Sequence, residues 1–83
     1  MKHLLKNITP LKNYKLLAEF QCGEKKYYDV NPWINKNKAF QPLKYENKLF
    51  EQMSVDTGGL AVVWNEDIDL YCDELYENGV SVR

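Results

Sequence analysis

The sequence predicts an α+β fold: a mainly antiparallel sheet of about five strands with two short helices, in the order β-β-β-α-β-β-α. Three observations predict it. Apolar and polar residues alternate along the first half, glycines separate such segments, and two short segments carry apolar residues at helical spacing. Because 83 residues suffice for one core only, we expect a single domain over residues 1–83.

Three strands are expected in the first part of the chain. Residues 3–8 (HLLKNI) form a short apolar segment that ends before Pro10. Along residues 14–21 every second side chain is apolar or aromatic, which places these side chains on one face of a sheet. A turn at Gly23 leads into residues 25–31, so the second and third strands should form a hairpin.

The middle of the chain predicts helical structure. Residues 32–35 (PWIN) are expected to form one helical turn or a bend. Apolar side chains recur at Tyr45, Leu49 and Met53, which is the i, i+4, i+8 spacing of one helix face. We therefore predict a helix over residues 45–53, which packing must stabilise because so short a helix is unstable alone.

The last third predicts two more strands and a closing helix. Residues 53–56 and 60–65 are strand-like, and the second is apolar on both faces, as is typical of a central strand. Residues 57–59 (TGG) form the turn between them, since glycine tolerates positive φ. Residues 68–70 continue as a short extended piece. Residues 72–78 predict a helix with carboxylates in its first turn, ended by the glycine that follows.

Charge is unevenly distributed along the sequence. Residues 1–48 contain ten lysines and four carboxylates, a balance of +6, whereas residues 49–83 contain eight carboxylates and one arginine, a balance of −7. Such asymmetry is found in proteins that bind nucleic acid or acidic partners. The alternative, which we favour, is that the two halves interleave in the fold, so that opposite charges face each other across strands.

Six of the twelve carboxylates lie within residues 66–77, and we examined them as a possible site. A calcium loop over these residues would lack its glycine and its bidentate glutamate. Asp69 and Asp73 could form an acid/base pair, but nothing near them in the sequence predicts burial. Cys72 has no adjacent base, because the only histidine is His3. We therefore predict no catalytic residue, no metal site and no cofactor, and expect that the protein is not an enzyme.

The remaining composition points to the cytoplasm. Cys22 and Cys72 are fifty residues apart and form no metal-binding or redox motif. No apolar run reaches the ~20 residues that span a bilayer, and the first residues lack the apolar core of a signal peptide. We expect a cytoplasmic protein with no membrane partner.

The ordered motifs resemble a known family. The segment YYDVNPWI contains Asp29, the later segment LKYENKLFEQMSVD contains Phe50, and the final acidic segment follows a glycine turn. The C-terminal signature comprises Trp64, Asp69, Leu70, Leu75 and Tyr76. This set, from about residue 4 to residue 79, resembles the short bacterial DUF2442-like family of domains of unknown function. The resemblance implies an α+β domain with mostly structural signature residues and no agreed activity. It also implies an accessory role in small regulatory or toxin–antitoxin-like gene pairs.

Four side chains are candidates for a partner surface. Leu17, Tyr27 and Val63 fall on the sheet face opposite the one assigned to the helices, and Trp33, which follows a proline, could either cap the core or lie exposed. Exposed apolar side chains that cluster mark interaction sites. We predict a non-enzymatic protein–protein interaction module, with another small protein or a second copy as partner. The alternative is a nucleic-acid-binding regulator that uses the lysine-rich first half, although a near absence of arginine weakens a sequence-reading role.

Overall fold

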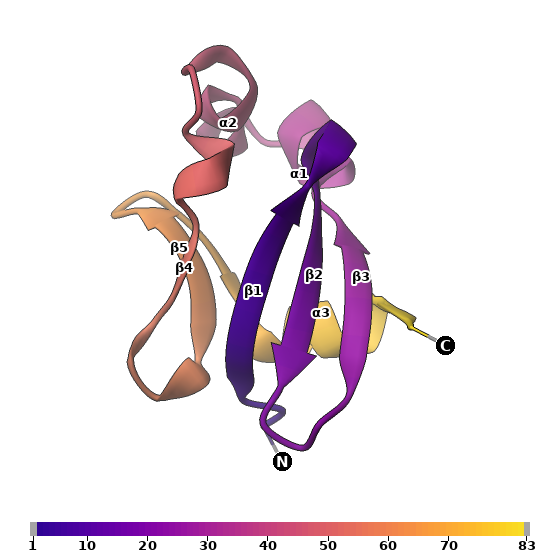
Figure 1. Cartoon of the computed structure of the whole chain (residues 1–83). Coiled ribbons are helices and arrows are strands. Elements are labelled where there is room, and N and C mark those ends of the chain that lie inside the picture. The colour runs from indigo at the N-terminus through magenta and orange to yellow at the C-terminus, as the bar shows by residue number, and fades with distance from the viewer. Residues whose placement is uncertain (1, 83) are drawn as a thin grey trace.

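The computed structural model describes residues 2–82 and confirms the α+β class (Figure 1). Within those residues, two antiparallel sheets and three α-helices enclose one core. All five predicted strands occur, together with two further strands. They divide into a sheet of four strands and a sheet of three. The predicted fold class therefore holds, but the strands form two sheets and not one sheet of about five strands.

The first sheet has the strand order β1-β2-β3-β7. Its strands are β1 (Leu5–Leu11), β2 (Lys15–Phe20), β3 (Lys25–Asp29) and β7 (Val80–Ser81). Strand β1 runs through Pro10, which the sheet tolerates because β1 is an edge strand and needs no ladder hydrogen bond from that position. The predicted hairpin of β2 and β3 is confirmed, with Gly23 in its turn at a φ of 98°.

The second sheet has the order β4-β5-β6. Its strands are β4 (Ser54–Val55), β5 (Ala61–Asn65) and β6 (Ile68–Tyr71). The prediction of a central strand is confirmed by β5. The predicted glycine turn is also confirmed, because Gly58 and Gly59 have φ values of 77° and 79°. A Cβ atom at Gly59 would lie 2.3 Å from the carbonyl oxygen of Leu5, so this turn packs directly against the start of β1.

The helices are α1 (Asn31–Lys36), α2 (Pro42–Tyr45) and α3 (Cys72–Asn78). Helix α1 confirms the predicted turn after Pro32, and α3 confirms the closing helix. The predicted helix over residues 45–53 is wrong. Lys48 adopts a φ of 63°, which interrupts any helix, and only the short 3-10 helix Phe50–Gln52 follows. Tyr45 is 75% exposed, whereas Leu49 is buried, so the spacing identified a core residue without identifying its conformation.

The core lies between the first sheet, the second sheet and α3. In Figure 1, α3 crosses behind β2 and β3, and the second sheet stands beside β1. Leu16, Phe20, Val62 and Leu75 are almost fully buried there. No described element among residues 2–82 lies over the opposite face of the first sheet (Figure 1).

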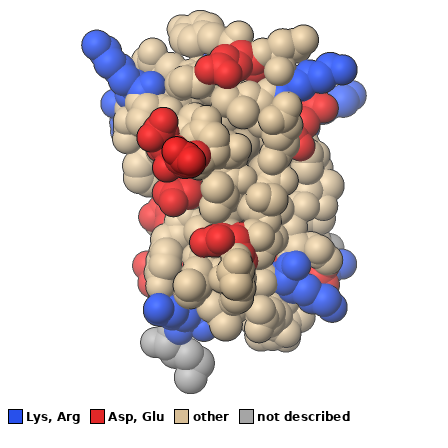
Figure 2. Space-filling model, turned by 90° about the vertical axis from the view of Figure 1, so that its left-hand side faces the viewer, with Lys and Arg blue, Asp and Glu red and all other residues tan. Residues whose placement is uncertain are grey.

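Apart from β7, which joins the first sheet through uncharged residues, the two halves of the chain form separate sheets, so the expected pairing of opposite charges from the two halves across strands is wrong. The first sheet comes from residues 5–29 plus β7, and the second comes entirely from residues 54–71. Short connections cause this, because consecutive strands pair with their neighbours in sequence. Figure 2 shows the side that includes the second sheet, with carboxylates across its middle and lysines at its corners.

Candidate interaction surface

The uncovered face of the first sheet carries an apolar row. We call this face the outer face, and its described side chains include Lys15, Leu17, Glu19, Lys25, Tyr27, Asp29 and Val80. Leu17 pairs with Tyr27 across β2 and β3, and Tyr27 pairs with Val80 across β3 and β7. Paired residues of antiparallel strands point to the same face, so these three side chains, the apolar row, lie side by side. Tyr27 is 46% exposed and Val80 is 68% exposed.

The strand period explains why the row points outward. Leu16, Ala18 and Tyr28 alternate with the row in β2 and β3 and are buried on the inner face. The inner face packs against the core, so the residues of the apolar row, which alternate with these three, face away from it. Leu17 is half-buried because its neighbours in β1 and β3 flank it.

The structure brings together some of the predicted surface residues and separates one of them. Leu17 and Tyr27 are neighbours in the row, as expected. Val63 lies in β5 of the second sheet, where it pairs with Ser54 and Asp69, and it is not part of the row. Sequence reasoning missed Val80, because a strand of two residues leaves no alternation to detect.

Trp33 lies next to the row at the edge of the core. Its ring stacks on Phe40 with centroids 5.1 Å apart, and its Nε1 donates a 2.7 Å hydrogen bond to the hydroxyl of Tyr28. A shallow hollow of about 320 Å³ lies between β3, α1 and α3, and its lining includes Tyr27, Trp33 and Val80. The hollow therefore connects the apolar row to Trp33.

Tyr28 links three elements beneath this hollow. Its hydroxyl accepts from Trp33 on α1 and donates a 2.7 Å hydrogen bond to Oε2 of Glu74 on α3. Burial, followed by the hydrogen bond to the Glu74 carboxylate, raises the pKa of Tyr28 well above its usual value. The hydroxyl therefore stays protonated, and can keep its hydrogen bond to Glu74, to a more alkaline pH than an ordinary tyrosine.

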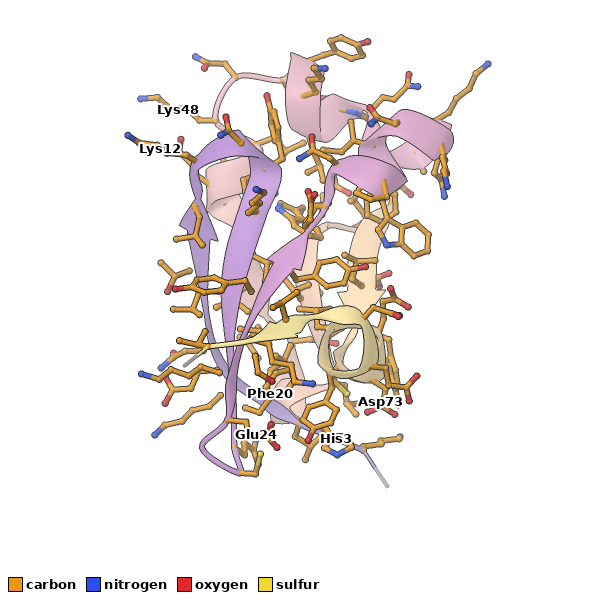
Figure 3. The ribbon with its side chains drawn as sticks, turned by 90° about the vertical axis from the view of Figure 1, so that its right-hand side faces the viewer. His3, Lys12, Phe20, Glu24, Lys48 and Asp73 are labelled. Atoms are coloured by element: carbon orange, nitrogen blue, oxygen red, sulfur yellow. The ribbon has the colours of Figure 1, made fainter. Side chains whose placement is uncertain are left out.

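A second polar cluster joins the N-terminal residues to α3 (Figure 3). The backbone N–H of His3 donates a 2.9 Å hydrogen bond to Oδ1 of Asp73, and this bond lowers the pKa of the carboxyl. The His3 ring stacks on Tyr76 with centroids 3.5 Å apart. The hydroxyl of Tyr76 donates to Oε1 of Glu24 at 2.5 Å, which raises the pKa of that hydroxyl. These contacts tie the chain start to the helix.

The acidic segment is divided between structural contacts and exposed positions. Asp73 and Glu74 bond to His3 and Tyr28, whereas Asp69 is exposed on β6. Within residues 2–82, no group of three His, Cys, Asp or Glu side chains is placed to hold a metal ion. Cys72 is buried, and burial, followed by the charge of Asp73, raises the pKa of its thiol.

The signature residues are mainly buried. Phe50, Trp64, Leu70 and Leu75 belong to the core, where Nε1 of Trp64 donates a 3.0 Å hydrogen bond to the Phe50 carbonyl. Asp29 is exposed, and its carboxylate accepts the backbone N–H of Asn31 at 3.0 Å, which shapes the turn from β3 into α1. The remaining signature positions are the exposed Asp69 and the half-buried Tyr76.

Three lysines line a groove at the end of the first sheet where β1 connects to β2. A groove of about 480 Å³ is lined by Lys12, Lys44 and Lys48, and also by Glu46 and Glu51. Figure 3 shows Lys12 and Lys48 pointing outward from adjacent turns. The groove is open and of mixed charge, and an anionic ligand bound in it would lie near three lysines.

Comparison with known proteins identifies a family. A family model described as "Protein of unknown function (DUF2442)" matches residues 5–81. No curated protein and no solved structure matches the chain. Among the described residues, no helix is long and apolar enough to cross a membrane.

Proposed function

The chain belongs to the DUF2442 family of proteins of unknown function, and from that premise we propose that it is a non-enzymatic module that binds protein through the outer face. The apolar row carries this proposal. Tyr27 and Val80 are exposed, adjacent and on a rigid sheet, and no described element among residues 2–82 covers them. Aromatic side chains on such a surface supply large contact area at low entropic cost.

The neighbouring hollow supports the same proposal. Trp33 lines it together with Tyr27, and the bonds of Trp33 to Tyr28 and of Tyr28 to Glu74 fix the indole ring before any partner arrives. A preorganised side chain loses little entropy on binding. An accessory regulator or antitoxin-like protein that acts by binding another protein would use this surface.

Co-purification from the native host tests this function. The variant carrying Tyr27→Lys and Val80→Lys places two charges in the apolar row, and the matched control is Tyr45→Lys, which changes a tyrosine that is 75% exposed outside the row. We expect the wild type and the control to retain the same bound protein and the double variant to lose it. Retention of that protein by all three chains would overturn the proposal.

A second candidate function is nucleic-acid binding at the lysine groove, favoured by the convergence of Lys12, Lys44 and Lys48. Fluorescence anisotropy with a mixed-sequence single-stranded oligonucleotide tests it. Backbone contacts weaken steeply with salt, so binding should fall between about 50 mM and 200 mM salt. It should also fall in a Lys12→Glu, Lys48→Glu variant and persist in Lys2→Glu. No binding at low salt would exclude this function.

A further inference from the structure

Four charged residues surround the centre of the apolar row in a diagonal pattern. Lys15 pairs with Asp29 on one side of the Leu17–Tyr27 pair, and Glu19 pairs with Lys25 on the other side. All four belong to the outer face, because they alternate with the buried residues of β2 and β3. Like charges therefore occupy opposite corners of a rectangle: the two lysines on one diagonal and the two carboxylates on the other.

This arrangement is complementary to itself. Two copies packed face to face are related by a two-fold axis that lies in the plane between them. If the axis runs across the strands, Lys15 faces Glu19 of the second copy, and Asp29 faces Lys25. If it runs along the strands, Lys15 faces Asp29 of the second copy, and Glu19 faces Lys25. Both axes place opposite charges together at every corner and bury the apolar row in the middle.

We propose that the outer face binds a second copy of this chain, so that the protein forms a two-fold homodimer; the proposal rests on the function proposed above. In this dimer, two sheets pack about 10 Å apart with their strands rotated by roughly 30°, as in a β-sandwich. Leu17, Tyr27 and Val80 of each copy form the apolar centre.

Oδ1 of Asp29 accepts hydrogen bonds from the backbone N–H and the side-chain amide of Asn31, which leaves Oδ2 of Asp29 and the other three charged groups for such contacts. Among residues 2–82, no opposite charge lies within 4.0 Å of Lys15, Lys25 or Asp29, and Glu19 makes only a 4.0 Å contact with the exposed Lys6. Cross-strand attraction between Lys15 and Asp29 also stabilises the isolated sheet. That attraction requires only opposite neighbours, and a row of lysines on β2 facing acids on β3 would satisfy it. The observed alternation along each strand goes further, because it makes the face self-complementary for an axis across the strands as well as for an axis along them.

The size of the face predicts a weak dimer. Strands spaced about 4.8 Å apart and residues rising about 3.3 Å give a face of roughly 15 by 20 Å. Such a face covers about 300 Å² per copy and about 600 Å² in total, which is smaller than a standard specific interface, so we expect weak and transient association. We expect a dissociation constant on the order of 50 µM, with dimer at high concentration and monomer on dilution.

Sedimentation equilibrium of the purified chain from about 5 µM to about 500 µM tests this inference, since that range brackets the expected affinity. The wild type should shift from monomer to dimer. Lys15→Glu should raise the dissociation constant at least tenfold, because both axes then bring like charges together. The control is Lys44→Glu, which changes an exposed lysine on α2 and should dimerise as the wild type does.

Charge reversal of a pair identifies the axis. Lys15→Glu with Glu19→Lys should restore the dimer if the axis runs across the strands, and Lys15→Glu with Asp29→Lys should restore it if the axis runs along them. Thermal unfolding of each variant confirms that the monomer is folded. A wild type that remains monomeric throughout, or a Lys15→Glu variant that dimerises normally, would overturn the homodimer. A protein that co-purifies with the wild type and is lost with the row variant would still support the interaction module.

Discussion

The hydroxyl of Tyr28 donates a 2.7 Å hydrogen bond to the carboxylate of Glu74, although the two residues are 46 positions apart in the chain. The same hydroxyl accepts a 2.7 Å hydrogen bond from Nε1 of Trp33. Through this one atom, α1 and α3 are fixed relative to β3. These two hydrogen bonds therefore join three residues that line the hollow beside the apolar row, Tyr28, Trp33 and Glu74. The bond to Glu74 requires the protonated phenol.

We predict that Tyr28→Phe destabilises the protein by about 1–3 kcal/mol. The substitution leaves the Trp33 N–H without its acceptor and the Glu74 carboxylate without its donor while keeping the ring in the core. Urea unfolding measures the change. Tyr45→Phe removes an exposed hydroxyl and should alter the free energy of unfolding by less than about 0.5 kcal/mol. Equal effects of the two variants would contradict the role of Tyr28.

We predict that Gly59→Ala is more destabilising than Gly58→Ala. The two glycines have nearly equal φ values, 79° and 77°, so the backbone strain of a side chain is similar at both. A Cβ atom at Gly59 would lie 2.3 Å from the Leu5 carbonyl oxygen, whereas the space around Gly58 is open. We expect a loss of about 1 kcal/mol at Gly58, the cost of a left-handed conformation with a Cβ atom, and at least twice that at Gly59, measured by urea unfolding. Similar losses of stability at the two positions would contradict the close packing of this turn against β1.

We predict that Asp73 stabilises the fold only while its carboxyl is ionised. The backbone N–H of His3 lowers the pKa of this carboxyl in the folded state below its ordinary value of 3.8. A lowered folded-state pKa contributes stability above the unfolded-state value, and this contribution is lost as the pH falls through the folded-state pKa. Unfolding measured at pH 7 and pH 3 should show a smaller pH dependence for Asp73→Asn than for the wild type, with Asp69→Asn as control. An unchanged pH dependence in Asp73→Asn would contradict this assignment.

We predict that substitutions in the apolar row affect association and not stability. Tyr27 is 46% exposed on the outer face, and the side chains of the core lie on the opposite face. Tyr27→Lys should therefore change the free energy of unfolding by about 0.5 kcal/mol or less, as measured by thermal unfolding of a dilute sample. A loss as large as that of Tyr28→Phe would show that the row is structural.

Local patterns in the sequence account for most of the strands. Alternation along residues 14–21 and the glycine turn at residues 57–59 depend only on neighbours in sequence, and both predictions hold. The predicted helix over residues 45–53 is wrong because apolar spacing indicates burial and not conformation. Leu49 is buried as the spacing indicates, but the positive φ of Lys48 interrupts the segment. The prediction that the closing helix ends at a glycine is correct, but the reason for a glycine there differs from a left-handed helix cap. Gly79 has a φ of −80°, and a Cβ there would lie 2.5 Å from the Leu75 carbonyl oxygen.

The candidate surface was less accessible to sequence reasoning. Leu17 and Tyr27 were predicted on one face because each follows the period of its own strand, but their contact depends on the register of the hairpin. Val63 was assigned to the same face on the assumption of a single sheet, and the division into two sheets separates it. Val80 joins the row only through its pairing with Tyr27, a contact between distant parts of the chain that local patterns do not encode.

Photo-crosslinking at position 27 tests self-association through the outer face most directly. A benzophenone amino acid replaces Tyr27 in one chain and the exposed Tyr45 in a control chain, and each purified protein is irradiated at high concentration. The homodimer proposed for this face predicts an adduct of twice the chain mass from position 27 and little from position 45. Equal yields at the two positions, or no adduct at position 27, would contradict it.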